Sequence, residues 1–201
     1  TAVAVNYARY ARREPTLAPI LAAGVVTAAA TMFPRILLVG TLIQPALLEP
    51  LGRALGAMAV VAYALAFWQW RQGLRAELPP ATLPMRNPFE LAPALQFGLL
   101  LGLIMIGAHA LLGWLGDAGV YALAAMSGLA DVDAITLSLA RLTQGTLTLD
   151  LAVRGILLAA FVNTLVKATL VTVIGGRAIG ARVGAAIGLT IFTGAATLLV
   201  R

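Results

Sequence analysis

The chain has 201 residues, of which 61% are hydrophobic and only 11% are charged, and its mean hydropathy is +0.94. This composition lies outside the range of soluble globular domains and predicts an integral membrane protein. There is no cysteine, which excludes disulfides and thiolate metal sites, and the net charge of +6 comes from arginines at the ends of apolar runs. Such arginines are expected to set membrane topology and not to bind nucleic acid.

Five apolar runs are long enough to cross a bilayer, which takes about 20 residues. They cover residues 17–44, 51–70, 91–115, 149–174 and 180–200. The proline-rich segment 71–93 is expected to be a solvated loop, because proline breaks helices. The sequence therefore predicts one all-α domain over residues 1–201, a polytopic transmembrane helical bundle with five or six spans. Because Thr1 is not an initiator methionine, we expect a fragment of a longer protein.

The sixth apolar stretch, residues 118–142, is interrupted by Ser127, Gly128, Asp131 and Asp133. We expect two half-length helices here. They would either stack into one broken transmembrane helix or fold back as a re-entrant hairpin.

Arginine positions leave these two arrangements open. The basic N-terminal segment favours a cytoplasmic N-terminus. A crossing broken helix would then place Arg141 and Arg201 in the cytoplasm, whereas a re-entrant hairpin would place Arg177 and Arg182 there. The number of arginines on the cytoplasmic side is nearly equal in the two arrangements.

A diverged internal repeat is predicted at the offset of 132 positions that separates Thr31 from Asn163 and Arg35 from Lys167. Residues 1–48 would be the second part of a first repeat, and residues 118–175 the equivalent part of a second. A chance match between Ala- and Leu-rich stretches is the alternative. The repeats would be parallel with a crossing broken helix and inverted with a re-entrant one. At this offset Thr1 is equivalent to Asp133, so only the second repeat carries the carboxylate. We therefore expect an asymmetric site, part of which is formed by residues upstream of this chain.

The two aspartates each have two interpretations. Asp131 either caps the N-terminus of the second half-helix, where its carboxylate would accept a backbone N–H, or lines a transport path. Asp133 shares a small, polar stripe with Thr136 and either belongs to a transport or structural polar core or faces an aqueous vestibule. Ionisable groups at this depth are expensive and predict function.

Asn163 and Lys167 are four residues apart and therefore share one helix face. Thr31 and Arg35 are their counterparts in the first repeat. A cation repeated at one depth would pair with a carboxylate of the broken helix. Alternatively, Lys167 extends to the far membrane interface. The candidate path residues are Asp131, Asp133, Ser127, Thr136, Asn163, Lys167, Arg35 and Thr31.

Gly176, Gly180, Gly184 and Gly188 recur every four residues and predict a flat ridge on the last helix. The ridge would pack within one subunit or form a homodimer contact.

No nucleotide-binding loop, zinc-ligand cluster or nucleophile motif is present. The chain is therefore expected to be no enzyme and to use no cofactor, and any metal would need oxygen ligands.

Several motifs resemble the DUF4010 domain, the C-terminal membrane domain of bacterial proteins in the MgtC/SapB family. They are Met-Phe-Pro-Arg at 32–35, Asn-Pro-Phe-Glu-Leu at 87–91, Gly-Asp-Ala-Gly-Val-Tyr at 116–121, the aspartate segment 127–138 and Asn-Thr-Leu-Val-Lys-Ala at 163–168. The resemblance implies a multi-pass protein of the bacterial inner (plasma) membrane and a link to magnesium-associated transport. It carries over no established binding residues.

The predicted function is a membrane transporter or channel-like permease for a small ion or solute, coupled to a divalent cation or a proton. The alternative is a non-transporting structural or regulatory membrane module that acts through helix–helix contacts. The expected partners are the lipid bilayer and the small ion or solute.

Overall fold

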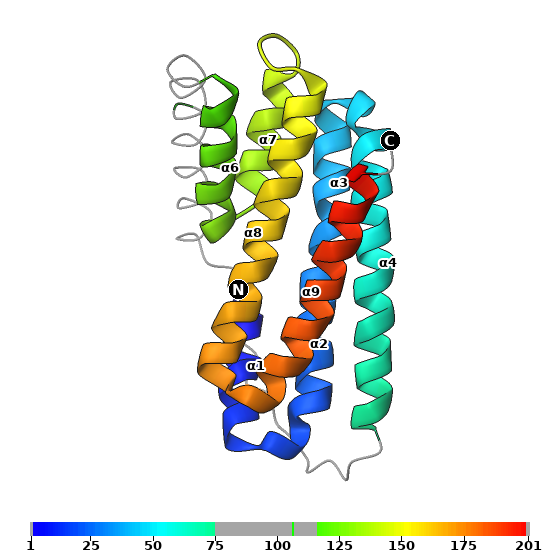
Figure 1. The fold of residues 1–201 in the computed structure, drawn as a ribbon, viewed down its shortest axis with the longest axis vertical. Helices are drawn as coiled ribbons and strands as arrows, with labels where there is room; N and C mark the ends of the chain where they lie inside the picture. The colour runs from blue at the N-terminus through cyan, green and yellow to red at the C-terminus, as the bar shows by residue number, and fades with distance from the viewer. Residues whose placement is uncertain (1, 75–105, 107–115, 200–201) are drawn as a thin grey trace.

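The computed structural model describes residues 2–74, 106 and 116–199, and these residues are predominantly helical with no strand among them (Figure 1). The elements are α1 (Ala2–Arg13), a 3-10 turn (Pro15–Leu17), α2 (Ala18–Ala30), α3 (Met32–Ile43), a second 3-10 turn (Pro45–Leu47), α4 (Leu48–Gly73), α6 (Asp117–Ala130), α7 (Asp133–Leu142), α8 (Leu149–Gly175) and α9 (Arg177–Leu199). The predicted all-α class is confirmed for this part of the chain.

Four helical segments are long and apolar enough to cross a membrane. They are Pro15–Ile43, Pro45–Gly73, Leu149–Gly175 and Arg177–Leu199. Each overlaps a predicted run, and the remaining run, 91–115, lies outside the described residues together with residues 75–93 of the predicted loop. Residues 71–73 were expected in that loop but form the last turn of α4. The expectation was wrong there because the first proline, which would end the helix, comes only at Pro79.

The first span is interrupted at Thr31, between α2 and α3. Pro34 lies in the first turn of α3, has no N–H and crowds the carbonyl four residues earlier, at Ala30. The Thr31 amide still bonds to the Thr27 oxygen (3.0 Å), and its hydroxyl donates to the Ala28 oxygen (3.0 Å). The sequence thus builds a turn near the middle of this span.

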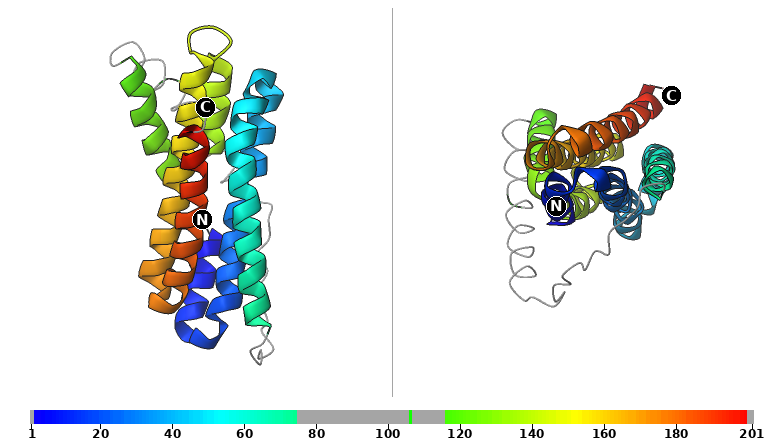
Figure 2. Two further views of the ribbon diagram at one scale, coloured as in Figure 1. Left: turned by 45° about the vertical axis from the view of Figure 1, so that its right-hand side comes forward. Right: turned by 90° about the horizontal axis from the view of Figure 1, so that it is seen from below.

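The α6 and α7 helices fold back on themselves as a hairpin. In both side views, α6 runs from the end of the molecule near the α7–α8 loop to about mid-height, and α7 returns to the same end (Figures 1 and 2). Asp131 is extended between the helices, with φ −154° and ψ 148°. The re-entrant alternative therefore describes the fold, and the stacked, crossing alternative is wrong.

The opposite end of the molecule gathers α1's last turn, the start of α2, the end of α4 and the α8–α9 junction (Figure 1). Arg12 Nη1 donates to the Ile174 oxygen (3.5 Å), and Gln69 Nε2 donates to the Arg182 oxygen (3.3 Å). Arg177 and Arg182 therefore lie at the same end as Arg12, as the re-entrant alternative predicts.

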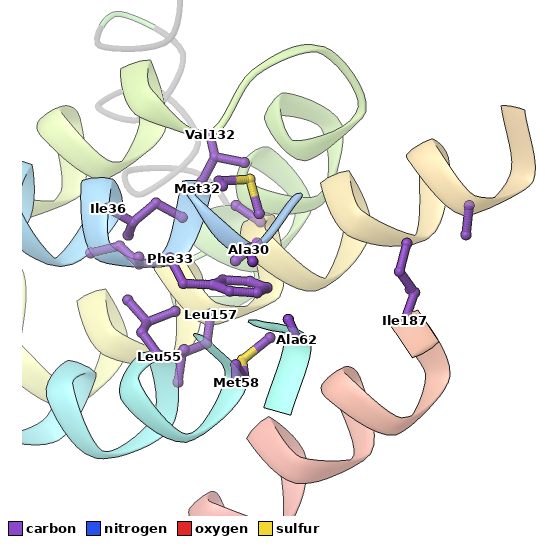
Figure 3. Packing of buried hydrophobic residues seen from close by; sticks show 14 of the residues in the cluster. Ala30, Met32, Phe33, Ile36, Leu55, Met58, Ala62, Val132, Leu157 and Ile187 are labelled. Atoms are coloured by element: carbon purple, nitrogen blue, oxygen red, sulfur yellow. The ribbon is translucent and has the colours of Figure 1, made fainter. Parts of the chain in front are cut away.

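All the described helices contribute to the hydrophobic core, and Phe33, Ile36, Leu55, Met58 and Leu157 of α3, α4 and α8 are among its almost completely buried side chains (Figure 3). Small residues let the helix backbones approach these side chains closely, and van der Waals contact then stabilises the association.

Gly194 shows how close that approach is on α9. A Cβ added there would fall 2.5 Å from Met58 Sδ and 2.9 Å from Phe161 Cε1. A larger residue here would force the Met58 and Phe161 side chains to shift, so glycine allows the present close packing of α9 against α4 and α8.

Candidate functional site

The end of α6 is held to α8 by Asn163. Its side-chain amide donates to the Gly128 oxygen (2.9 Å), and Asn163 is only 4% exposed. The last carbonyls of a helix have no partner within the helix, so a buried helix end needs such a donor. A Cβ on Gly128 would fall 2.7 Å from the Ala159 oxygen. Glycine therefore allows the contact that puts the carbonyl within reach of Asn163.

Asp131 occupies the turn between α6 and α7. Its backbone N–H donates to the Ser127 oxygen (2.8 Å), and its Oδ1 accepts the N–H of Val132 (2.9 Å). The N-cap residue of α7 is Val132, so the expectation that Asp131 caps this helix was wrong. Asp131 lies one residue too early and stabilises the turn itself.

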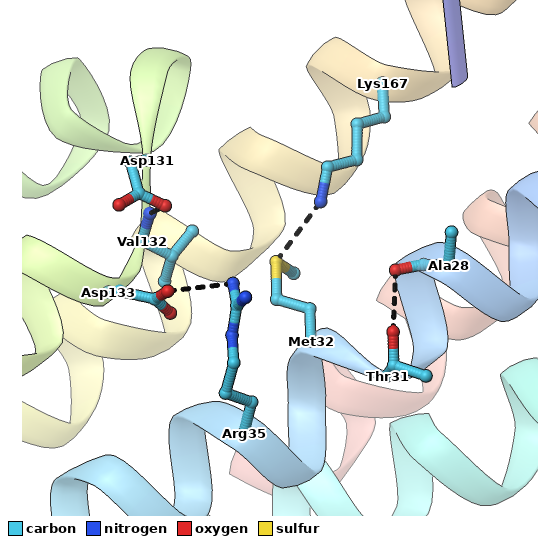
Figure 4. A network of polar contacts seen from close by, with 8 residues as sticks. All are labelled: Ala28, Thr31, Met32, Arg35, Asp131, Val132, Asp133 and Lys167. Atoms are coloured by element: carbon cyan, nitrogen blue, oxygen red, sulfur yellow. Dashed lines mark hydrogen bonds and ion pairs between the residues drawn. The ribbon is translucent and has the colours of Figure 1, made fainter. Parts of the chain in front are cut away.

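Asp133 begins α7 and forms an ion pair with Arg35 of α3, with 2.9 Å between Oδ2 and Nη2 (Figure 4). The side chain of Asp133 is 22% exposed and that of Arg35 is 56% exposed. The pair joins the tip of the re-entrant hairpin to the interrupted first span.

Two polar atoms beside this ion pair are left without hydrogen-bond partners in the part of the chain that the structure describes. They are Asp133 Oδ1 and Thr136 Oγ1, both buried and one helical turn apart on α7. A Cβ on Gly40 would lie 3.7 Å from Thr136 Cγ2, so α3 covers this face of α7. Buried groups of this kind are costly unless another group satisfies them.

Lys167 was expected either to pair with a carboxylate or to extend to the membrane interface. Its Nζ lies 3.5 Å from Met32 Sδ, facing the interruption of the first span (Figure 4), and forms no ion pair with the described residues. It interacts electrostatically with Arg35, Asp131 and Asp133. The predicted pairing of a repeat-related cation with Asp133 does occur, but Arg35 makes it.

Lys167 and Arg35 both line a cavity of about 180 Å³. It is lined by Val3, Ala4, Val25, Ala28, Ala29, Thr31, Met32, Arg35 and Lys167. Thr31, Arg35 and Lys167 were predicted as site residues and share this cavity. Ser127, Asp131, Asp133, Thr136 and Asn163 lie on the neighbouring hairpin and its α8 contact. Met32, which the sequence reasoning missed, separates the two cations, and nothing in its apolar side chain predicts that position.

The four glycines predicted to form one ridge do not do so. Gly176 has φ +80° and ends α8, a backbone conformation that glycine favours in a helix C-cap. A Cβ on Gly180 would fall 2.8 Å from Thr172 Cγ2, so this residue packs within the chain. Gly184 and Gly188 have open space beside them. The expected ridge is thus divided among a turn, an internal contact and an outer face.

The long apolar helices, the re-entrant hairpin and the polar cluster at its tip are features of an all-helical membrane protein. Among the described residues there is no group of three or more acidic or histidine side chains that could hold a metal ion.

The chain belongs to the family described as "Domain of unknown function (DUF4010)", whose model matches residues 1–175. It is 30% identical over 178 residues to a protein of Aquifex aeolicus (strain VF5) that carries the name "Uncharacterized protein"; the match covers 88% of this chain and 77% of that protein. No solved structure matches the chain.

Proposed function

We propose that this protein is a membrane transporter or channel-like permease for a small ion or solute. The observation that carries the proposal is the Arg35–Asp133 ion pair of 2.9 Å at the tip of the re-entrant hairpin. Charged groups within membrane segments are rare and commonly mark ion or substrate pathways. Non-helical backbone at membrane depth is likewise found where it lines a cavity or is enclosed by protein.

We infer that α1–α4 and α7–α9 are inverted repeats, which is the architecture of many secondary transporters. At the predicted offset, residues 18–43, which make up α2, Thr31 and α3, fall on residues 150–175 of α8. In Figure 1 the α2–α3 segment and α8 run in opposite directions. α1 and α7 both begin at mid-height and run to opposite ends of the molecule.

Two pairs of equivalent contacts support the inverted repeat. Arg12 donates to the Ile174 oxygen, and Gln144, its counterpart at the offset, donates to the Ile43 oxygen. The two acceptors, Ile43 and Ile174, are separated by the same offset to within one residue.

The second pair involves glycines. A Cβ on Gly24 would collide with the Tyr7 ring, and a Cβ on Gly155 would fall 2.8 Å from Cδ1 of Leu139, the counterpart of Tyr7. The two glycines again agree to within one residue. In inverted-repeat transporters the substrate site lies near the bilayer midplane, where the repeats meet.

The orientation that fits this proposal places the Arg12 and Arg177 end in the cytoplasm of a multi-pass inner-membrane protein. The resemblance to MgtC/SapB-family membrane domains favours the same location. Asp133 Oδ1 and Thr136 Oγ1, which have no hydrogen-bond partner among the described residues, favour coupling to a cation, either a divalent ion or a proton.

The test is flux into liposomes that contain the purified protein. Separate preparations would enclose dyes that report protons, magnesium or chloride. Asp133→Asn should abolish whichever flux the wild type supports, while Asp117→Asn, the same change at an exposed position in α6, should leave it intact. Wild-type flux in Asp133→Asn would remove this carboxylate from the mechanism.

A second function, a non-transporting structural or regulatory module, is favoured by the outer face of α9. Gly184 and Gly188 have open space beside them, and Phe192 is 70% exposed. A partner helix could approach closely here. This function predicts that Gly184→Leu breaks dimerisation measured by energy transfer between labelled copies in liposomes, and that no dye detects flux.

A further inference from the structure

We propose that the cavity between Lys167 and Arg35 binds a small oxyanion, a carboxylate or phosphate group, and that the transported solute carries this group. The inference rests on the proposed transport function and names its substrate class. It begins with the lining of the cavity, which includes two cationic side chains and no acidic one. The volume of about 180 Å³ is several times the volume that one water molecule occupies in the liquid, about 30 Å³.

Lys167 has no ion-pair partner among the described residues, and its one hydrogen-bond contact is to the Met32 sulfur at 3.5 Å. A thioether is a weak acceptor. An ammonium group removed from bulk water is destabilised unless a counter-charge is near. An anion in the adjoining cavity would supply a direct partner, which the more distant Asp131 and Asp133 do not.

Arg35 contributes a second, oriented set of donors. Its guanidinium carries five N–H groups in a planar fork, and the structure shows one ion-pair contact, to Asp133. A planar guanidinium matches the geometry of carboxylate and phosphate oxygens better than that of a spherical ion. The remaining donors, together with the Lys167 ammonium, suit an oxyanion.

The geometry also couples the anion to Asp133. An oxyanion on the remaining donors of Arg35 would share the positive charge that attracts Asp133, and so would weaken the ion pair. Weakening the ion pair leaves Asp133, whose Oδ1 already lacks a partner in the described residues, available to a cation. The two charges would then be carried together.

The sequence provides a specific probe, because Lys167 is its single lysine. Purified protein in liposomes would be treated with a water-soluble amine reagent, and modification of the Lys167 peptide would be followed by mass spectrometry. Phosphate or acetate would replace chloride at constant ionic strength. We expect the modification rate to fall, by about tenfold when the anion reaches ten times its Kd. An equal rate in all three salts, or no modification even in chloride, would overturn the proposal.

The role of Arg35 is tested in the same assay. Arg35→Gln should remove the protection by phosphate or acetate, and Arg35→Lys should retain part of it. Thermal unfolding would verify that both variants are folded, and unchanged protection in folded Arg35→Gln would contradict a shared site. Protection without uptake of labelled phosphate or acetate above that of protein-free liposomes would refute transport alone, whereas such uptake without protection would refute the anion site alone.

Discussion

Arg35 Nη2 and Asp133 Oδ2 lie 2.9 Å apart and join two interruptions of regular helix, one between α2 and α3 and one between α6 and α7. Each partner comes from the residues immediately after a turn. The contact therefore depends on both turns being formed, and it links the α6–α7 hairpin to the α2–α3 segment.

The strength of this contact can be measured by a double-mutant cycle with Arg35→Gln and Asp133→Asn. We expect a coupling free energy of about 1 kcal/mol, because the pair is partly exposed and solvent screens it. The measurement is chemical unfolding in mixed micelles. The exposed Glu49–Arg53 pair, with atoms 3.5 Å apart, is the matched control and should give a smaller value. Equal coupling free energies in the two pairs would mean that the Arg35–Asp133 contact is no stronger than an ordinary surface ion pair.

Asn163→Leu should destabilise the fold by about 1–3 kcal/mol, the cost of leaving the buried Gly128 carbonyl without a donor. Thr164→Val is the matched control on the next residue. Its hydroxyl donates to the Ala160 oxygen within α8, an acceptor that the helix backbone also uses, so the loss should stay below about 1 kcal/mol. Thermal unfolding in detergent would measure both. If the two variants melt alike, Asn163 does not anchor α6.

Gly128→Ala should separate α6 from α8, because the new methyl group would lie 2.7 Å from the Ala159 oxygen. We expect a loss of about 1–3 kcal/mol from this overpacking. Gly56→Ala makes the same change on α4 in open space and should be neutral or stabilise the helix by up to about 1 kcal/mol. Comparing the free energies of unfolding checks the difference, and equal effects would contradict the close contact.

The sequence was sufficient to predict the helical class, four of the five long apolar runs as candidate spans and the position of the break, because those follow from local hydropathy and from one polar turn. It also predicted that Arg35 and Lys167 occupy related positions near the aspartates. Only Arg35 reaches Asp133. Which of the two cations pairs with Asp133 depends on the direction in which α3 leaves the turn at Thr31. The local sequence does not determine that direction.

The direction of the α6–α7 hairpin could not be predicted, since the arginine totals for the two topologies were nearly equal. Packing decides it: Gly128 and Gly155 let α6 and α7 lie against the same helix, α8. The role of Gly176 was likewise hidden, because a helical glycine and a C-cap glycine can follow the same four-residue spacing. The backbone conformation distinguishes them.

The re-entrant hairpin is the central claim, and cysteine accessibility tests it most directly. The chain contains no cysteine, so Asp117→Cys, Gly145→Cys and Glu14→Cys can each be introduced alone at exposed positions and treated with a membrane-impermeant thiol reagent in oriented vesicles. We predict that the first two react from the same side and Glu14→Cys from the other. Reaction of Asp117→Cys and Gly145→Cys from opposite sides would contradict the hairpin and, with it, the inverted repeat.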